Sequence, residues 1–515
     1  MPFLYLPLLV LVIAAFAGHW VSGAEDCWAH AAVGRWIWEH RQVPRHTLFL
    51  WTVSNSEPWV AHAWLSQLMT YGILQTGGTA LVRVLTVLLA ALPFILLWWC
   101  WSRESRVHSL TAVLFWIGIL ASAIRFSARP ELVTALFLTL LLVFLMRWSA
   151  RPTLPPSLVR GGILPAMGLL LLFTVWVNSH GMVLLGLALL GLTASCDLLQ
   201  DRFSGRSRGL LLLTLPAGAA LLLNPYGMGY WKALQGLQGE TFRRINEWRP
   251  FWQSPPLQAV TLVEILVLTM VAFLVWALNP GRRWSHLGWL LVVGGSFCKA
   301  RRFHGLLALV DLAVLAANSR RLDPNFLWQA FQRRHRPDKV SGDLPLSPRQ
   351  RGLVHGGLVL WLLISAWGAI PPPPGDMAPV PEAPVRFILD HRIPGNFFND
   401  FGNSSYLDWR CGGSPPLYID VLNAYPDQIF LNWLEIVNVT PRGRDLLKQQ
   451  HIGYILLTRP RSGEELKKLA DYLDGNPEWV KVYVGREGRL WVRHTPEYEY
   501  LWASQEDSRS WNKVP

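Results

Sequence analysis

The residues best suited to chemistry near the start of the chain follow directly after its first apolar run. In the segment Gly23-Ala-Glu-Asp-Cys-Trp-Ala-His30, Asp26 and His30 are four positions apart, so on a helix their side chains share one face. A carboxylate there can act as a general base that accepts a proton from an acceptor hydroxyl. A solvated interfacial helix with a capping aspartate would explain the same residues, and the spacing leaves both interpretations open.

A second polar group lies further along the same segment, in Glu57-Pro-Trp-Val-Ala-His62. Glu57 is a candidate substrate contact, and His62 or His30 is a candidate for positioning the acceptor hydroxyl. The tryptophans of this stretch are equally typical of residues that anchor a chain at a membrane surface. A divalent cation bound by Asp26 and the two histidines is a further alternative, although these ligands are far apart in the chain. No other cofactor is indicated.

Three short polar segments between later apolar runs carry cationic and amide groups. They are Arg125–Pro130, Asn178–Gly181 and Lys299–His304. Among them, Arg129, Arg301 and Arg302 are candidate phosphate ligands, because a guanidinium group donates two parallel hydrogen bonds to a phosphate. Asn178 and His180 are candidate substrate contacts. A single arginine is also explained by snorkelling to ordinary lipid headgroups, but several on one side of a membrane favour a phosphate site.

A long polar segment separates two later apolar runs and adds two candidates. It begins with Asn224-Pro-Tyr-Gly227, a turn signal that ends a helix, and Tyr226 in this turn is a candidate substrate contact. Glu247 follows, beside Trp248, and is a candidate contact for a sugar or a lipid.

The elements that must position these residues are membrane helices. Of the 515 residues, 51% are hydrophobic and only 16% are charged, which is too apolar for an ordinary soluble enzyme. Run after run approaches the ~20 apolar residues that span a bilayer. The eleven predicted spans are Phe3–Val21, Ala80–Trp101, Ser109–Ala123, Leu132–Met146, Gly162–Val177, Met182–Leu198, Leu210–Leu223, Val260–Leu278, Leu287–Cys298, His304–Ala317 and Leu353–Ile370. The stretch Pro58–Gln75 is predicted to be a helix lying at the interface.

The distribution of basic residues predicts the orientation of these spans. Arginines and lysines cluster in alternate short loops, and those loops are cytoplasmic if the N-terminus is inside. All the candidate site residues then lie on the outer side. The first run lacks a basic n-region, so it is expected to be retained as a helix. The prediction is a multi-pass protein of the bacterial inner membrane. Its net charge of +13 reflects these loops and favours anionic lipid, with no stripe suited to nucleic acid.

The composition changes after Pro371–Pro374, a stiff linker. Residues 1–371 are predicted to form the membrane domain, with a first outer loop at 23–78, and residues 372–515 a small soluble α/β domain outside the membrane. Within it, Tyr454–Thr458 is expected to be a buried strand, Glu464–Leu473 a helix, and Val480–Val484 with Leu490–His494 a hairpin. The five cysteines are scattered singly and indicate neither a zinc site nor a disulfide framework.

The order of these motifs resembles one family. The pattern Asp26-Cys-Trp-Ala-His30, followed by Pro58-Trp-Val-Ala-His-Ala-Trp-Leu-Ser-Gln67, resembles the first outer loop of a bacterial branch of GT-C-type membrane glycosyltransferases. The further similar segments are Gly34-Arg-Trp-Ile37, Arg129-Pro130, Trp176-Val-Asn-Ser-His-Gly181, Asn224-Pro-Tyr-Gly227, Glu247-Trp248, Pro394-Gly-Asn-Phe-Phe-Asn-Asp400 and Tyr418-Ile-Asp420. The resemblance therefore covers nearly the whole chain.

The resemblance implies a polytopic helical fold and a reaction. The wider superfamily includes protein O-mannosyltransferases, aminoarabinose transferases and oligosaccharyltransferases, which take a sugar from a polyprenyl-phosphate or polyprenyl-pyrophosphate carrier. An acidic residue in their first outer loop is essential, and it maps to Asp26. This chain departs from the branch at Ala63, where the usual pattern has Glu, and at His46-Thr47, where an acid is common.

The function predicted from the sequence is transfer of a sugar from a polyprenyl-phosphate donor to a periplasmic-side lipid, glycan or protein. A transporter is the first alternative, but it needs charges within the membrane, and the middles of the apolar runs contain few. A non-catalytic envelope scaffold is the second, and the loss of the acid at Ala63 is compatible with it. Loss of activity on changing Asp26, with folding intact, would exclude the scaffold.

Overall fold

The computed structural model describes residues 26–54, 57–104, 109–151, 162–231, 246–253, 259–318, 380–458 and 466–502, together with Ile13. The chain divides into two compact units. One, here called the helical unit, comprises 1–19, 83–227 and 243–371, and the other, here called the mixed unit, comprises 20–82, 228–242 and 372–515. The mixed unit thus joins the predicted first outer loop to the C-terminal residues. The two units are described separately below.

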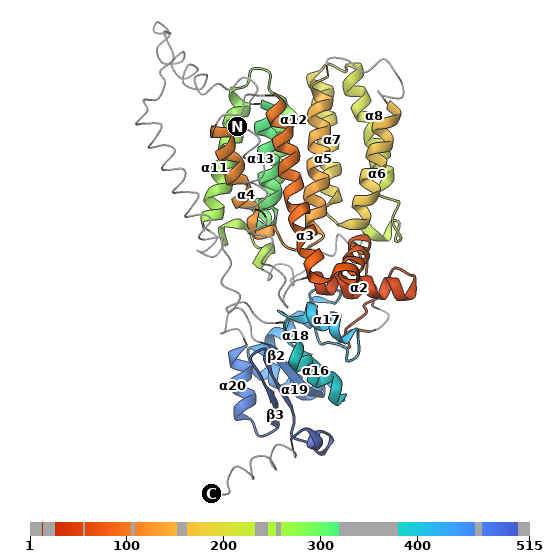
Figure 1. Ribbon diagram of the computed structural model, residues 1–515, viewed down its shortest axis with the longest axis vertical. Helices are drawn as coiled ribbons and strands as arrows, with labels where there is room; N and C mark the ends of the chain where they lie inside the picture. Colours follow the sequence, from red (N-terminus) through yellow and green to blue (C-terminus); the bar gives the residue numbers. More distant parts are fainter. Residues whose placement is uncertain are drawn as a thin grey trace, which may run out of the picture. The chain divides into compact units, whose positions relative to one another are not determined.

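The helical unit is built of apolar helices that pack side by side (Figure 1). They are, in chain order, the second part of α3 (Trp64–Glu104), α4 (Ser109–Ser122), α5 (Glu131–Ser149), α6 (Leu164–Ser179), α7 (Val183–Gln200), α8 (Gly205–Ala220), α11 (Ala259–Leu278), α12 (Trp284–Lys299) and α13 (His304–Asn318). Each coincides with one predicted span. The predicted spans Phe3–Val21, apart from Ile13, and Leu353–Ile370 lie outside the described residues.

Four described helices are both long and apolar enough to cross a membrane. They are Trp64–Trp101, Glu131–Ser149, Val183–Gln200 and Ala259–Leu278. In addition, Leu164–Ser179 is a shorter apolar helix. Their outward surfaces expose large apolar side chains such as Leu171, Leu199 and Met270, as lipid-facing helices do. Two buried acids, Glu264 on α11 and Asp311 on α13, lie inside this unit and were not singled out from the sequence; Thr269 donates a hydrogen bond to Asp311 at 2.8 Å.

The polar loops of the helical unit meet in two groups, at opposite ends of α5. At the Ser149 end, Arg283 donates to both carboxylate oxygens of Asp201 at 3.0 Å and to the Ser149 carbonyl at 3.0 Å. Arg206 also pairs with Asp201. At the Glu131 end, the segments before α5 and before α13 come together, as the site described below. The loops predicted to lie on the same side of a membrane therefore meet at the same end of α5.

Helix α3 differs from the prediction at its start. The stretch Pro58–Gln75 was expected to form an interfacial helix, but Pro58–Ala63 is not helical and α3 begins at Trp64. The helix continues to Glu104 with a non-helical residue at Gly78 (φ 58°), where only glycine adopts this backbone without strain. The residues up to Val82 belong to the mixed unit.

The mixed unit contains a four-stranded sheet of order β1-β2-β4-β3. Its strands are β1 (Asn396–Asn399), β2 (Ile452–Thr458), β3 (Trp479–Val484) and β4 (Gly488–Arg493). The buried strand and the hairpin predicted from the sequence correspond to β2 and to the antiparallel pair of β3 and β4. Strand β1, which pairs parallel to β2, was not predicted. Its neighbouring helices are α16 (Glu382–His391), α17 (Ser404–Cys411), α18 (Asp427–Val437), α19 (Pro441–Gln449) and α20 (Lys467–Gly475).

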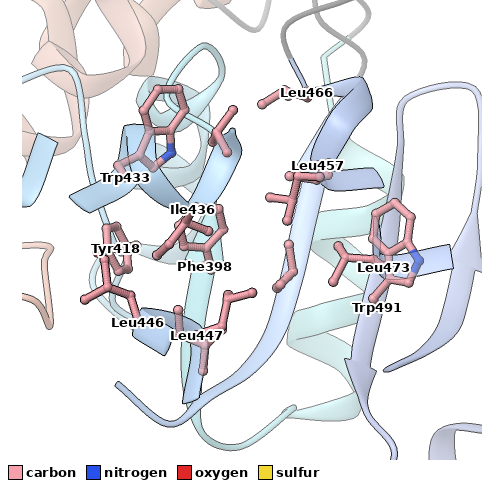
Figure 2. Packing of buried hydrophobic residues seen from close by; sticks show 14 of the residues in the cluster. Phe398, Tyr418, Trp433, Ile436, Leu446, Leu447, Leu457, Leu466, Leu473 and Trp491 are labelled. Carbon is pink, nitrogen blue, oxygen red and sulfur yellow. The ribbon is translucent and has the colours of Figure 1, made fainter. Parts of the chain in front are cut away.

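Large apolar side chains fill the space between the sheet and its helices (Figure 2). Trp433 and Ile436 of α18 pack with Phe398 of β1, while Leu473 of α20 packs with Trp491 of β4. All five side chains are at most 3% exposed. Burying an aromatic or aliphatic side chain of this size stabilises a fold by about 1.5–3 kcal/mol, so this core makes the mixed unit a stable framework.

The predicted first outer loop is part of the same core. Helix α2 (Cys27–His40) packs on α17, with the guanidinium group of Arg35 over the ring of Trp409 and hydrogen-bonded to its carbonyl at 2.9 Å. Leu50 forms a β-bridge with Leu417, and Trp51 donates to the Phe397 carbonyl at 2.8 Å. The loop is therefore fixed by the C-terminal residues.

Candidate active site

The candidate residues of the helical unit include a cluster of arginines at the Glu131 end of α5. A short 3-10 turn, Ala123–Arg125, precedes α5 and directs Arg125 back onto the first residue of the helix. The Arg125 Nε donates to Oε1 of Glu131 at 3.2 Å, and its Nη2 pairs with Oε2. A carboxylate in the first turn also complements the positive end of the helix dipole. Both side chains are nearly buried, so this pair is the fixed base of the cluster.

Glu247 connects this base to two further arginines. It lies in a short 3-10 turn, Asn246–Trp248, and its Oε2 accepts hydrogen bonds from Arg125 at 2.8 Å and from Arg129 at 3.0 Å. Its Oε1 lies 3.4 Å from Nη1 of Arg302. Burial by itself would raise the pKa of Glu247, but the charges of the three arginines outweigh it and hold the pKa well below its usual range. Glu247 is therefore a carboxylate at neutral pH.

Arg301 and Arg302 enter from the turn between α12 and α13. The backbone of this turn is held by a hydrogen bond from the Arg301 amide to the Arg249 carbonyl at 2.9 Å. The Arg302 guanidinium group lies 4.4 Å from the centre of the Trp248 ring and 3.5 Å from Oε2 of Glu131. The stacking leaves the edge of the guanidinium group available for hydrogen bonds.

The cluster has surplus donors and surplus positive charge. Arg125, Arg129 and Arg302 pair with two carboxylates, and Arg301 adds a fourth positive charge in the same turn as Arg302. Within the described part of the chain the buried Nη1 of Arg301 and Nε of Arg302 have no hydrogen-bond partner. Buried N–H groups of a cation are costly to leave unpaired, so the arrangement suits an additional anion. The predicted phosphate ligands Arg129, Arg301 and Arg302 therefore lie in one cluster. Arg125 and Glu131, which organise it, were not among the candidates.

The other candidates of the helical unit fix helix ends. Asn178 donates hydrogen bonds to the carbonyls of Thr174 and Leu223, both at 2.8 Å. Nδ1 of His180 lies 2.8 Å from the hydroxyl of Thr134, one turn along α5 from Glu131.

The expected turn at Asn224–Gly227 is confirmed. The Asn224 side chain accepts a hydrogen bond from the Tyr226 amide at 2.9 Å, and Gly227 adopts a positive φ of 52°. A substrate role for Tyr226, Asn178 and His180 stays a prediction.

The mixed unit carries its own group of candidate residues, on α2. The structure confirms a helix that carries Asp26 at its N-cap and His30 one turn later. The Asp26 side chain makes no capping hydrogen bond, although its negative charge still complements the helix dipole. Gly34 permits close packing of α2 against α3, since a Cβ atom there would lie 2.1 Å from the Gln67 carbonyl oxygen. This approach brings the Gln67 amide to 3.4 Å from Nδ1 of His30.

The remaining first-loop candidates flank the start of α3. His62 lies in the turn before the helix, and its amide donates to the Val60 carbonyl at 2.8 Å. Glu57 is partly buried, and its backbone pairs with Thr47 and Ser54. Ala63, which stands where the resembling family has an acid, is buried. Within the described ranges, no three His, Cys, Asp or Glu side chains are grouped closely enough to hold a metal ion.

Three buried aspartates of the mixed unit were not predicted as functional residues. Asp400 is satisfied by hydrogen bonds from the amide and hydroxyl of Thr458 and from the Asn403 amide. Asp408 on α17 has no hydrogen-bond partner for either carboxylate oxygen among the described residues, and Oδ2 of Asp420 has none. Burial raises the pKa of Asp420 to about 7, and burial together with the charge of Asp420 raises that of Asp408.

No protein-family model and no curated protein matches the sequence. The structure is nevertheless similar to that of an oligosaccharyltransferase from Archaeoglobus fulgidus in its apo form, with 10% identity and a TM-score of 0.56, over 89% of this chain and 69% of that one. The chain has the fold of GT-C-type membrane glycosyltransferases. The same archaeal enzyme, AglB, in complex with an inhibitory peptide and a dolichol-phosphate, gives 11% identity and a TM-score of 0.56, over 93% of this chain and 72% of that one.

A bacterial neighbour agrees in length as well. ArnT from Cupriavidus metallidurans, solved with undecaprenyl phosphate, is 12% identical with a TM-score of 0.51, and the match covers 96% of this chain and 98% of that one. The GT-C-type resemblance inferred from the first-loop motifs is thereby confirmed at the level of the fold.

Proposed function

We propose that the protein transfers a sugar from a polyprenyl-phosphate donor to a hydroxyl acceptor on the periplasmic side of the bacterial inner membrane. The observation that carries this proposal is the cluster of Arg125, Arg129, Arg301 and Arg302, which offers unsatisfied buried donors to an anion within a GT-C-type fold. The known ligands of two structural neighbours, dolichol-phosphate and undecaprenyl phosphate, are anions of the same class.

The reaction follows from the groups available. The donor phosphate binds to Arg129, Arg301 and Arg302, and the acceptor hydroxyl donates its proton to Asp26, oriented by His30 or His62. The acceptor oxygen forms a bond to the anomeric carbon, the bond from that carbon to the phosphate oxygen breaks, and the configuration is inverted. Because phosphate is a good leaving group, the protein contributes mainly orientation and stabilisation of charge.

The proposal extends to topology. Eleven spans with a cytoplasmic N-terminus put the arginine cluster and the first loop outside, and the C-terminal domain becomes periplasmic. Two observations support this orientation of the spans. The predicted outer loops meet at the Glu131 end of α5, and the basic loops with Arg206 and Arg283 meet at its Ser149 end. In the proposal the soluble domain from residue 372 on binds the acceptor.

The first test is donor consumption by purified protein in nanodiscs. Each member of a panel of radiolabelled polyprenyl-phosphate sugars is incubated with the wild type and with Asp26→Asn. We expect the wild type to release or transfer label and the variant to lose activity by about 10²–10⁴-fold, the usual contribution of a general base. Glu39→Gln is the matched control, because it removes one carboxylate from an exposed position on the same helix and should retain activity.

Full activity in a folded Asp26→Asn variant would remove Asp26 from the chemistry. If the folded wild type binds and consumes no donor, the enzyme proposal fails and the scaffold takes its place.

A further inference from the structure

The carboxylate of Glu247 occupies the position in the arginine cluster that an anionic ligand would take. It accepts hydrogen bonds from Arg125 and Arg129 and lies 3.4 Å from Arg302, so three guanidinium groups from two separate segments converge on one carboxylate. A phosphate ester presents the same kind of anionic oxygen atoms to arginine. The donors that would receive a phosphate are thus largely occupied by the protein's own anion.

The two acids of the cluster are not equivalent. The Glu131 side chain is 7% exposed, lies on a regular helix and accepts from both Nε and Nη2 of Arg125. The Glu247 side chain is 28% exposed and lies in a single 3-10 turn, where it makes one contact with each of three arginines. Partly exposed contacts of this kind exchange more easily than a buried bidentate pair. Glu131 is therefore the permanent partner of Arg125, and Glu247 is the replaceable one.

We propose that Glu247 is an internal counter-anion that competes with a phosphate ester for Arg129 and Arg302. This inference rests on the proposed function, since it concerns the same site. The exchange conserves charge, because a phosphodiester donor and the carboxylate each carry one negative charge. In the empty site Glu247 keeps the arginines from repelling one another, and on ligand binding its side chain moves away from them.

The competition has a consequence for turnover. Cleavage of the donor converts a phosphodiester into a phosphomonoester, which carries about −1.5 to −2 charges at neutral pH. The product would then bind the arginines more tightly than the donor and would slow each cycle. A carboxylate that returns to the same guanidinium groups opposes this tight binding, so Glu247 promotes product release.

The test is direct binding of undecaprenyl phosphate to the full chain in nanodiscs of zwitterionic phosphatidylcholine. Glu247→Gln keeps the size of the side chain and removes its charge, and we expect it to bind roughly tenfold more tightly than the wild type. Glu247→Asp retains the competing carboxylate and should bind within about twofold of the wild type. The matched control is Asp201→Asn, which removes a carboxylate that bridges Arg206 and Arg283 at the other end of α5, ~27 Å away for a helix of this length.

Two further arms identify the source of the phosphate. Inorganic phosphate and nanodiscs that contain phosphatidylglycerol are used as competitors. A site specific for polyprenyl phosphate predicts that neither displaces undecaprenyl phosphate at equal concentration. Circular dichroism and thermal melting confirm that each variant is folded. A folded Glu247→Gln that binds no more tightly than the wild type overturns the inference and leaves the phosphate site standing. Absence of binding in the wild type and all variants overturns the phosphate site itself.

Discussion

One group of buried carboxylates in the helical unit and one in the mixed unit are stabilised in opposite ways. At the Glu131 end of α5, each of the two acids contacts at least two arginines, and the pKa of Glu247 is held well below its usual range. In the mixed unit, Asp408 and Asp420 are buried together with no cation among the causes of their shifts, and burial raises the pKa of Asp420 to about 7. The arginine cluster keeps its acids charged, whereas burial favours the protonated form of Asp408 and Asp420.

This difference indicates which of the two groups is suited to bind an anionic ligand. Arginines that remain charged, with donors to spare, can exchange one anion for another without any proton transfer, as a phosphate site requires. A pair of buried carboxyl groups with raised pKa values has no such capacity, since ionising both acids in a buried site would cost several kcal/mol. We therefore expect an anionic ligand to bind at the arginine cluster, and we expect a structural role for Asp408 and Asp420.

The largest change in folding stability is expected where a buried charge loses its partner. Arg125→Gln leaves Glu131 buried without the bidentate partner that its side chain contacts. Removing one member of a buried ion pair typically costs about 3–5 kcal/mol, so the variant should unfold at markedly lower denaturant in detergent micelles. Arg208→Gln, on an exposed position of α8, is the control and should change stability by less than about 0.5 kcal/mol. Equal losses in both variants would show that the cluster is not a buried ion-pair network.

A smaller change in stability, here a gain, is expected for a substitution in the mixed unit. Because the folded-state pKa values of Asp408 and Asp420 are raised, the native state binds more protons than the unfolded state above pH ~4, and stability falls as the pH rises towards 7 and beyond. Asp408→Asn places a neutral amide beside Asp420 and should stabilise the unit by about 1–3 kcal/mol at pH 8, with no gain at pH 4.

Hydrogen exchange of the β2 backbone amides in the full chain measures this change at each pH. Asp471→Asn, an exposed position on α20, controls for the loss of one negative charge. If Asp408→Asn lowers protection at pH 8, the carboxyl pair is ionised and has a partner outside the described residues.

Sequence reasoning succeeded where the physical signal is local. The described membrane helices follow from runs of apolar residues long enough to span a bilayer, and β2 follows from the run Tyr454–Thr458. Arg129 and Arg302, two of the three arginines grouped from the sequence, both lie beside Glu247, and their role as phosphate ligands with Arg301 stays a prediction.

The failures concern pairings between distant residues. The contacts of Glu247 with Arg125 and Arg129, more than a hundred residues away, were not predicted, because no local pattern indicates such a partner; its contact with a sugar or a lipid stays a prediction. Strand β1 escaped prediction because Asn396–Asn399 is only four residues long with asparagine at both ends. The packing of α2 on α17 likewise depends on contacts between side chains, such as Trp28 with Tyr406, that are remote in sequence.

The smallest effect is expected for an ion pair that neither unit buries. Arg410 donates to Glu382 through Nε at 2.7 Å and Nη2 at 2.8 Å, yet both side chains are 33% exposed. Water screens such a pair, so Glu382→Gln should destabilise the mixed unit by no more than about 1 kcal/mol, and high salt should diminish even this loss. The measurement is the same exchange of β2 amides at low and at high salt. A loss as large as that of Arg125→Gln would mean that geometry, rather than burial, decides the strength of ion pairs in this protein. The contrast between the paired and the protonated acids would then need a different cause.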